Sequence, residues 1–109
     1  MSASVRCLVV GMPTAEIAER NLRLGEALSV RFAELHHHFP PVPSLELVVA
    51  PLYCPDFDAL ELIDQIGAAG YRGMVRVVAP VLPNRAIVLR ELRSHAARKG
   101  ITVEMVNEG

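Results

Sequence analysis

Apolar residues run almost without interruption through three short segments of the chain. These segments are VRCLVV at residues 5–10, LELVVA at 45–50 and MVRVVA at 74–79. A strand that is covered on both faces has this pattern, because both of its rows of side chains are buried. In a fourth segment, ITVEMV at 101–106, apolar residues alternate with a second row of Thr102, Glu104 and Val106. This half-polar alternation predicts an edge strand, or one whose second face is only partly covered.

Two of the segments that follow these strands have the apolar spacing of an amphipathic helix. The first is predicted to begin at the capping residue Thr14 and to end near Ser29. The second follows a turn and contains Asp58 and Glu61, which have the spacing of a helix-capping pair. Its apolar stripe ends at Gly70, which is typical of the residue that stops a helix.

A third helix is predicted from Arg85 to Lys99, after Asn84 as its cap and before Gly100 as its stop. Its predicted buried stripe consists of Val88, Leu89, Leu92, His95 and Ala96. We expect His95, because it lies on this stripe, to be a hydrogen-bonded histidine of the core.

Between the first helix and the second apolar strand, the segment VRFAELH at 30–36 alternates in polarity and predicts an edge strand. The following HHHFPPVPS has three prolines within four residues, which predicts an extended connection. The element order is then β-α-β-loop-β-α-β-α-β. This order predicts a single α/β domain over residues 1–109, with a flavodoxin-like three-layer fold and a five-stranded parallel sheet in the order 2-1-3-4-5.

The composition is that of a soluble chain, and we expect a cytoplasmic protein without a bound cofactor. Half of the residues are apolar, the formal net charge is −1, and no apolar run is long enough to cross a membrane. Nucleic acid is disfavoured as a partner, because the chain is slightly acidic and no aromatic residues interleave its arginines. The two cysteines, Cys7 and Cys54, make no disulfide framework.

The turn Pro55-Asp56-Phe57-Asp58-Ala59, between an apolar strand and a helix, resembles the Pro-Asp-x-Asp-Gly turn of response-regulator receiver domains, the CheY-like family. The resemblance covers most of residues 45–106 and, more loosely, the first strand and helix. Ala59 replaces the glycine of the family pattern. The resemblance implies a regulatory module in bacterial signal transduction that contacts other proteins through its last helix and strand.

The same resemblance implies that the phosphorylation chemistry of the family has been lost. Counting four residues back from the turn places Pro51 where receivers have the phosphate-accepting aspartate, and proline has no carboxylate. The acidic pair that holds Mg²⁺ in receivers falls at Gly11 and Met12, and the hydroxyl residue after the fourth strand falls at Ala79. The chain therefore resembles a degenerate receiver with no catalytic residue and no metal site.

Two helices of the receiver pattern have no counterpart, because the proline-rich segment replaces the second and only three residues follow Val106. We expect this to leave a strip of one sheet face bare, including part of Val5–Val10 and the side of Thr102, Glu104 and Val106. Exposed apolar strips favour association, so we expect a homodimer or another protein partner on this strip. The resemblance adds Arg90 and Arg93 on the last helix to the interface candidates.

Other features leave a second class of function open, a small cytosolic enzyme or ligand-binding domain. Its site would lie at the carboxyl ends of the strands, near Cys54 and Gly11–Thr14. His36, His37 and His38 could bind a metal ion, but the sequence offers no cysteine or acidic residue at ligand spacing beside them. We interpret them as residues of a solvated loop.

Overall fold

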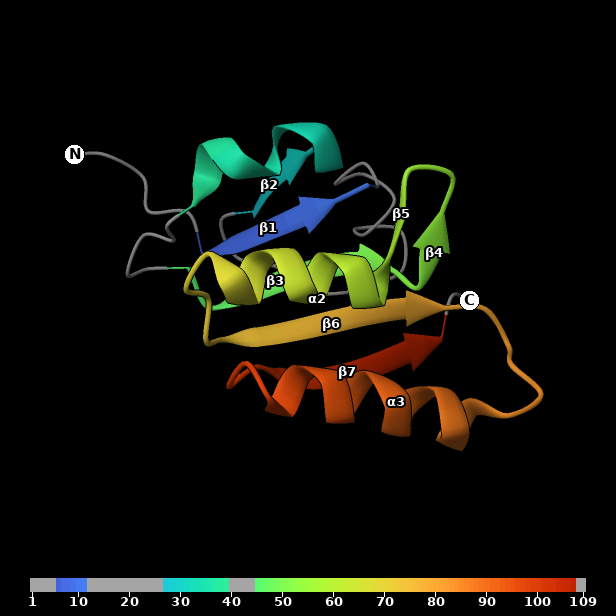
Figure 1. Cartoon of the computed structure of the whole chain (residues 1–109). Coiled ribbons are helices and arrows are strands. Elements are labelled where there is room, and N and C mark those ends of the chain that lie inside the picture. Colours follow the sequence, from blue (N-terminus) through green and yellow to red (C-terminus); the bar gives the residue numbers. More distant parts are fainter. Residues whose placement is uncertain (1–5, 12–26, 40–44, 108–109) are drawn as a thin grey trace.

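The centre of the fold is a parallel sheet of five strands in the order β2-β1-β3-β6-β7 (Figure 1). The computed structural model describes residues 6–11, 27–39 and 45–107. The strands of the sheet are β1 (Cys7–Val10), β2 (Ala27–Val30), β3 (Leu47–Pro51), β6 (Met74–Ala79) and β7 (Thr102–Asn107). Numbered within the sheet alone, this order is 2-1-3-4-5, so the predicted α/β fold and strand order are confirmed. The last strand lies at an edge, as the half-polar pattern predicts.

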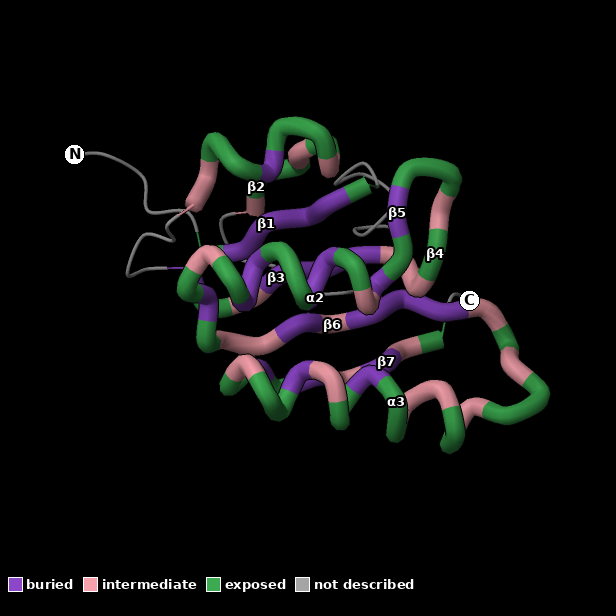
Figure 2. The backbone as a smooth tube through the Cα atoms, in the orientation of Figure 1, coloured by how far each residue is buried: buried purple, intermediate pink, exposed green. Residues whose placement is uncertain are grey.

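The helices of the described residues lie together on one face of the sheet (Figure 1). They are the 3-10 helix η1 (Phe32–His38) and the α-helices α2 (Ala59–Ala68) and α3 (Arg85–Ala97). Beneath them, neighbouring strands bring Leu8, Val48, Val75 and Val103 into one buried row. The main hydrophobic core lies between this face and the helices (Figure 2). Between β2 and β3, the described residues 31–39 contain the short helix η1, and the proline-rich residues 40–44 lie outside the described residues.

Helix α2 forms as its sequence predicts. The side chain of Asp58 accepts a hydrogen bond of 2.8 Å from the backbone amide of Glu61, which caps the first turn. The apolar stripe of the helix, with Leu62 and Ile63, is fully buried. Gly70 ends the segment with a φ of 100°, a conformation that glycine adopts without the strain that a side chain would cause.

Helix α3 begins at Arg85 as predicted but ends at Ala97, before the predicted end at Lys99, and three details at the residue level differ from the prediction. Asn84 stands at the cap position, but its side chain makes no capping hydrogen bond, and its backbone carbonyl accepts from Ile87 and Val88 instead. The core stripe is narrower than predicted, with Leu92 and Ala96 buried and Val88 and Leu89 partly buried. His95 is half-exposed: its Nε2 lies 2.9 Å from Oδ1 of Asp64 on α2, so it links two helices at the surface.

The predicted strand over residues 30–36 is wrong. Strand β2 ends at Val30, and the residues after Arg31 form η1. In a 3-10 helix, residues three apart lie on the same side, so Phe32 and Leu35 can both pack on the core, whereas in a strand they would point to opposite faces. The predicted end of the first helix near Ser29 is also wrong, because Ser29 belongs to β2. The start of that helix at Thr14 lies outside the described residues.

The prediction of a bare strip on the second sheet face is only partly correct. Cys7 and Val9 on this face are 2% and 0% exposed, so the part of the strip on β1 is covered within the chain itself. They form a second, small hydrophobic cluster with Val49 and Val78. Only the β7 end of the strip is open, where Thr102 is exposed and Glu104 and Val106 are half-buried.

Candidate functional site

The carboxyl ends of β1, β3 and β6 form the edge of the sheet at which α/β folds place ligands. These ends carry Gly11, Pro51 and Ala79. Pro51 pairs with Val78 as the last residue of β3, and Ala79 is fully buried. None of the three side chains offers an oxygen to a cation or a phosphate. Met12, the fourth position that the receiver resemblance singled out, lies outside the described residues.

A hairpin closes over these strand ends. It consists of the short strands β4 (Tyr53–Cys54) and β5 (Phe57–Asp58), and the amide of Ala59 donates a 2.8 Å hydrogen bond to the carbonyl of Leu52 at its base. In Figure 1 it stands beside the arrowheads of the central strands. Because Cys54 and Phe57 pair directly across the hairpin, the turn between them presents Asp56 to solvent.

Phe57 fills the space above Gly11. The Phe57 ring is buried and stacks on Phe32 of η1, with ring centroids 4.6 Å apart and planes 11° from parallel. A Cβ atom at Gly11 would lie 2.7 Å from Phe57 Cε1 and 3.7 Å from the sulfur of Cys54, so this contact leaves no room for a side chain. An apolar stack therefore fills the space beside Gly11 at the carboxyl end of β1.

The two carboxylates of the hairpin stand at positions that belong to the local structure, one at a helix cap and one in the turn. Asp58 caps α2, and Asp56 is an exposed residue of the turn. Cys54, the candidate of the alternative enzyme hypothesis, is a free and half-buried thiol packed against the main core. The other half of that hypothetical site, residues 12–14, lies outside the described residues.

The hairpin also forms one wall of a groove, which we call the hairpin groove. The groove encloses about 230 Å³, and its other walls are the first turn of α2 and the middle of α3. Its lining residues are Leu52, Tyr53, Asp58, Ala59, Leu60, Val88, Glu91 and Leu92. The groove was not predicted from the sequence, in which the one signal for it was an aromatic residue, Tyr53, ahead of the turn.

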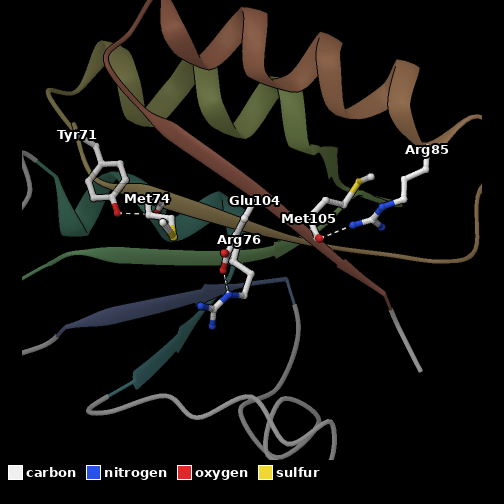
Figure 3. Close-up of polar contacts among 6 residues, drawn as sticks. All are labelled: Tyr71, Met74, Arg76, Arg85, Glu104 and Met105. Atoms are coloured by element: carbon white, nitrogen blue, oxygen red, sulfur yellow. Dashed lines mark hydrogen bonds and ion pairs between the residues drawn. The ribbon is translucent and has the colours of Figure 1, made fainter.

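The predicted interface residues are divided between two surfaces. Arg90 and Arg93 line a shallow depression along α3. Thr102, Glu104 and Val106 belong to the opposite sheet face, where Glu104 forms an ion pair with Arg76 of β6 (Figure 3). This pair was not predicted, although one charged residue within each of two apolar strands was a signal for it.

Arginines of α3 bind the free edge of β7. Arg85 donates a 2.5 Å hydrogen bond to the carbonyl of Met105 (Figure 3), and a second of 2.8 Å to the side chain of Asn107. Arg93 donates a longer one, 3.5 Å, to the carbonyl of Val103. These carbonyls point away from β6, so the arginines bind acceptors that another strand could otherwise pair with.

The histidine run lies at the end of η1 and not in an extended loop. The rings of His36 and His37 lie 4.1 Å apart between centroids, and His36 also borders a cavity of about 290 Å³ with Phe39 and Ile66. Within residues 6–11, 27–39 and 45–107, no three histidine, cysteine, aspartate or glutamate side chains lie close enough together to hold a metal ion.

Two buried groups have strongly raised pKa values. Burial raises the pKa of the Cys7 thiol to about 11, although the positive charge of Arg76 opposes this change. Burial also raises the pKa of Tyr71, whose hydroxyl donates a 2.7 Å hydrogen bond to the carbonyl of Met74 (Figure 3). Both groups therefore stay protonated at neutral pH, and the Cys7 thiol is a poor nucleophile.

Comparison with models of protein families, with curated proteins and with solved structures finds no match for this chain. Among the helices of the described residues, none has both the length and the apolar character needed to cross a membrane.

Proposed function

We propose that this chain is a non-enzymatic protein-interaction module with a regulatory role, one that resembles a bacterial receiver domain but works without phosphorylation. The observation that carries the proposal is the Phe32–Phe57 stack over Gly11, at the carboxyl ends of the strands. A receiver needs at this place a carboxylate that accepts phosphate and acidic ligands for Mg²⁺. Here an apolar contact fills the space, and Pro51 and Ala79 supply no ligand.

The proposal includes self-association through the open part of the second sheet face. This open surface is formed by Arg76, Thr102, Glu104 and Val106, and we call it the β6–β7 surface. The side chains of Arg76 and Glu104 are 22% and 38% exposed and already neutralise one another. A second copy can therefore cover this surface without leaving a buried charge unpaired, which would be costly.

The loss of phosphorylation is tested by NMR. The protein is mixed with beryllofluoride and Mg²⁺, and in a separate sample with acetyl phosphate and Mg²⁺. Because no carboxylate stands at the strand end, we expect the amide resonances of residues 51–58 to stay in place. Saturable shifts in this segment, or an aspartyl phosphate detected by mass spectrometry, would contradict the proposal. A receiver domain with an intact site serves as the positive control.

Self-association is tested by light scattering after gel filtration. We expect twice the chain mass for the natural protein at micromolar concentration. Thr102→Glu places an uncompensated charge on the β6–β7 surface, so this variant should elute as a monomer. Ser94→Glu, which adds the same charge at an exposed position of α3, is the matched control and should remain dimeric. A natural protein that is monomeric under these conditions would overturn the dimer.

A further inference from the structure

The hairpin groove combines an apolar floor with charged residues that are all negative. Leu60 of α2 and Val88 and Leu92 of α3 give it an apolar floor. Its charged lining residues are Asp58 and Glu91, and no lysine or arginine lines it. The carboxylate of Asp58 also caps α2, so Glu91 is the acidic residue of the groove that has no such structural role.

The size of the groove favours side chains over a whole small molecule. Sites for small ligands and cofactors usually enclose about 300–1,000 Å³. The hairpin groove encloses about 230 Å³, which is room for one or two bulky side chains. Such a groove suits a protein segment that inserts an anchor residue.

Exposed apolar side chains extend the groove outward. Tyr53, on its wall, is 62% exposed, and Ile87, one turn before Glu91 on α3, is 61% exposed. Exposed apolar side chains that adjoin an apolar groove form a larger apolar patch, which is typical of interaction sites, and tyrosine is enriched among residues that dominate binding energy. The surroundings of the groove therefore have the composition of a protein-binding surface.

The negative charge of the groove favours an occupant that carries a positive charge. The nearest arginines of α3 point elsewhere: Arg85 and Arg93 bind the edge of β7, and Arg90 lines the depression on the other side of the helix. The negative charge of Glu91 thus stays available to a cation from outside. In a segment with lysine or arginine beside an apolar anchor residue, the anchor can pack on the apolar floor and the cation can pair with the acidic rim.

We propose that the hairpin groove binds a peptide segment of a partner protein, one in which a bulky apolar residue stands next to lysine or arginine. The anchor side chain packs on Leu60, Val88 and Leu92, Tyr53 covers it, and the cation lies against Glu91 and Asp58. The proposal goes beyond self-association, because the groove and the β6–β7 surface lie on different faces of the sheet. Either surface can therefore fail its test without affecting the other.

Two synthetic peptides test this inference by NMR titration. Both contain the same Leu-Phe pair, flanked by lysines in one peptide and by glutamates in the other. We expect the lysine peptide to shift the resonances of Tyr53, Leu60 and Val88, with an affinity at least about five-fold higher than that of the glutamate peptide at low salt. The difference should shrink as salt is added, because the charges on the rim are exposed.

Variants of the chain test the apolar part and the charged part of the interaction separately. Tyr53→Ala removes apolar contact and should lower the affinity for the lysine peptide about ten-fold. Glu91→Lys should reverse the preference between the two peptides. Glu46→Lys makes the same charge change just before β3, at the other end of the strands, and should leave both affinities unchanged. Each variant is first checked for the amide dispersion of the natural protein.

Several results would overturn the inference. The inference fails if neither peptide shifts groove resonances at millimolar concentration, or if the shifts map to α3 around Arg90. Equal binding of both peptides would reject the role of the acidic rim. If groove resonances move on dilution without any peptide, a second copy of the chain occupies the groove, and the assignment to a partner segment is wrong.

Discussion

At the scale of single residues, Gly11 and Gly70 have similar backbone conformations but different surroundings. Their φ angles are 79° and 100°. A Cβ atom at Gly11 would collide with the Phe57 ring at 2.7 Å, whereas nothing lies within 4 Å of one at Gly70. Gly70→Ala should therefore cost only backbone strain, about 1 kcal/mol, and Gly11→Ala should cost about 1–2 kcal/mol more. Urea unfolding measures both values.

The comparison of the two alanine variants isolates the packing of Phe57. If Gly11→Ala and Gly70→Ala lower the free energy of unfolding equally, the Phe57 ring does not press on Gly11, and the apolar stack over the strand ends is wrong. A double variant, Gly11→Ala with Phe57→Leu, should recover part of the free energy of unfolding that Gly11→Ala loses, because leucine lacks the ring atoms nearest to the new methyl group.

Residue patterns near Gly11 did not predict this contact. Gly11 ends a buried strand, and a glycine at that position is as typical of a phosphate-binding turn as of a turn packed against an aromatic ring. The stack depends on Phe32 and Phe57, which come from η1 and the hairpin and meet only in the folded chain. The sequence shows that Gly11, Pro51 and Ala79 carry no carboxylate, but it does not show which side chains fill the space beside Gly11.

At the scale of elements, α3 shields the edge of the sheet through Arg85 and Arg93. Together they donate hydrogen bonds to the outward carbonyls of Met105 and Val103. An unpaired edge strand is a template for another chain, so replacing both arginines with alanine should promote concentration-dependent association. We also expect the variant to lose about 1–2 kcal/mol of stability. Light scattering over a concentration series and urea unfolding measure the two effects.

The control for this prediction is Arg90→Ala. Arg90 belongs to the same helix and carries the same charge, but it is exposed and lines the depression on α3. Its removal should leave the association state unchanged. If the Arg85 and Arg93 double variant associates no more than the Arg90 variant, the arginines do not protect the β7 edge.

Elements with a single strong local signal were predicted well, and those that depend on distant partners were not. Helix α2 has its cap, its apolar stripe and its glycine stop within one short segment, and all three formed as expected. The segment 30–36 has an alternating pattern, but burying Phe32 and Leu35 on the same core requires a helical turn. Similarly, the pattern placed His95 in the core, whereas Asp64 on a different helix holds it at the surface.

At the scale of the whole molecule, the strand order followed from general rules of chain connection. Alternating strands and helices need right-handed crossovers, and few sheet orders satisfy them. The burial of Cys7 and Val9 could not be predicted in this way, because it depends on contacts between residues that are distant in the sequence, such as those with Val49 and Val78. The expected size of the bare strip was therefore too large, and the β6–β7 surface is the part that stays open.

The raised pKa of Cys7 connects one buried group to the stability of the whole fold. Burial raises the Cys7 pKa from 9.0 to about 11, so the folded chain keeps a proton that the unfolded chain releases. This contribution is fully present below pH 9 and is lost as pH rises towards 11. We expect the free energy of unfolding to fall by about 2 kcal/mol over this range because of Cys7. Urea unfolding at a series of pH values measures it.

Variants separate Cys7 from the other buried group. Tyr71, whose pKa burial also raises, adds its own loss of stability only at higher pH, because its ordinary value is 10.0. Cys7→Ala should flatten the profile between pH 9 and 10, and Tyr71→Phe should flatten it only above pH 10. Cys54→Ala removes the other thiol and should keep the decline, since Cys7 is still present. A decline of equal slope in Cys7→Ala would show that Cys7 does not control alkaline unfolding.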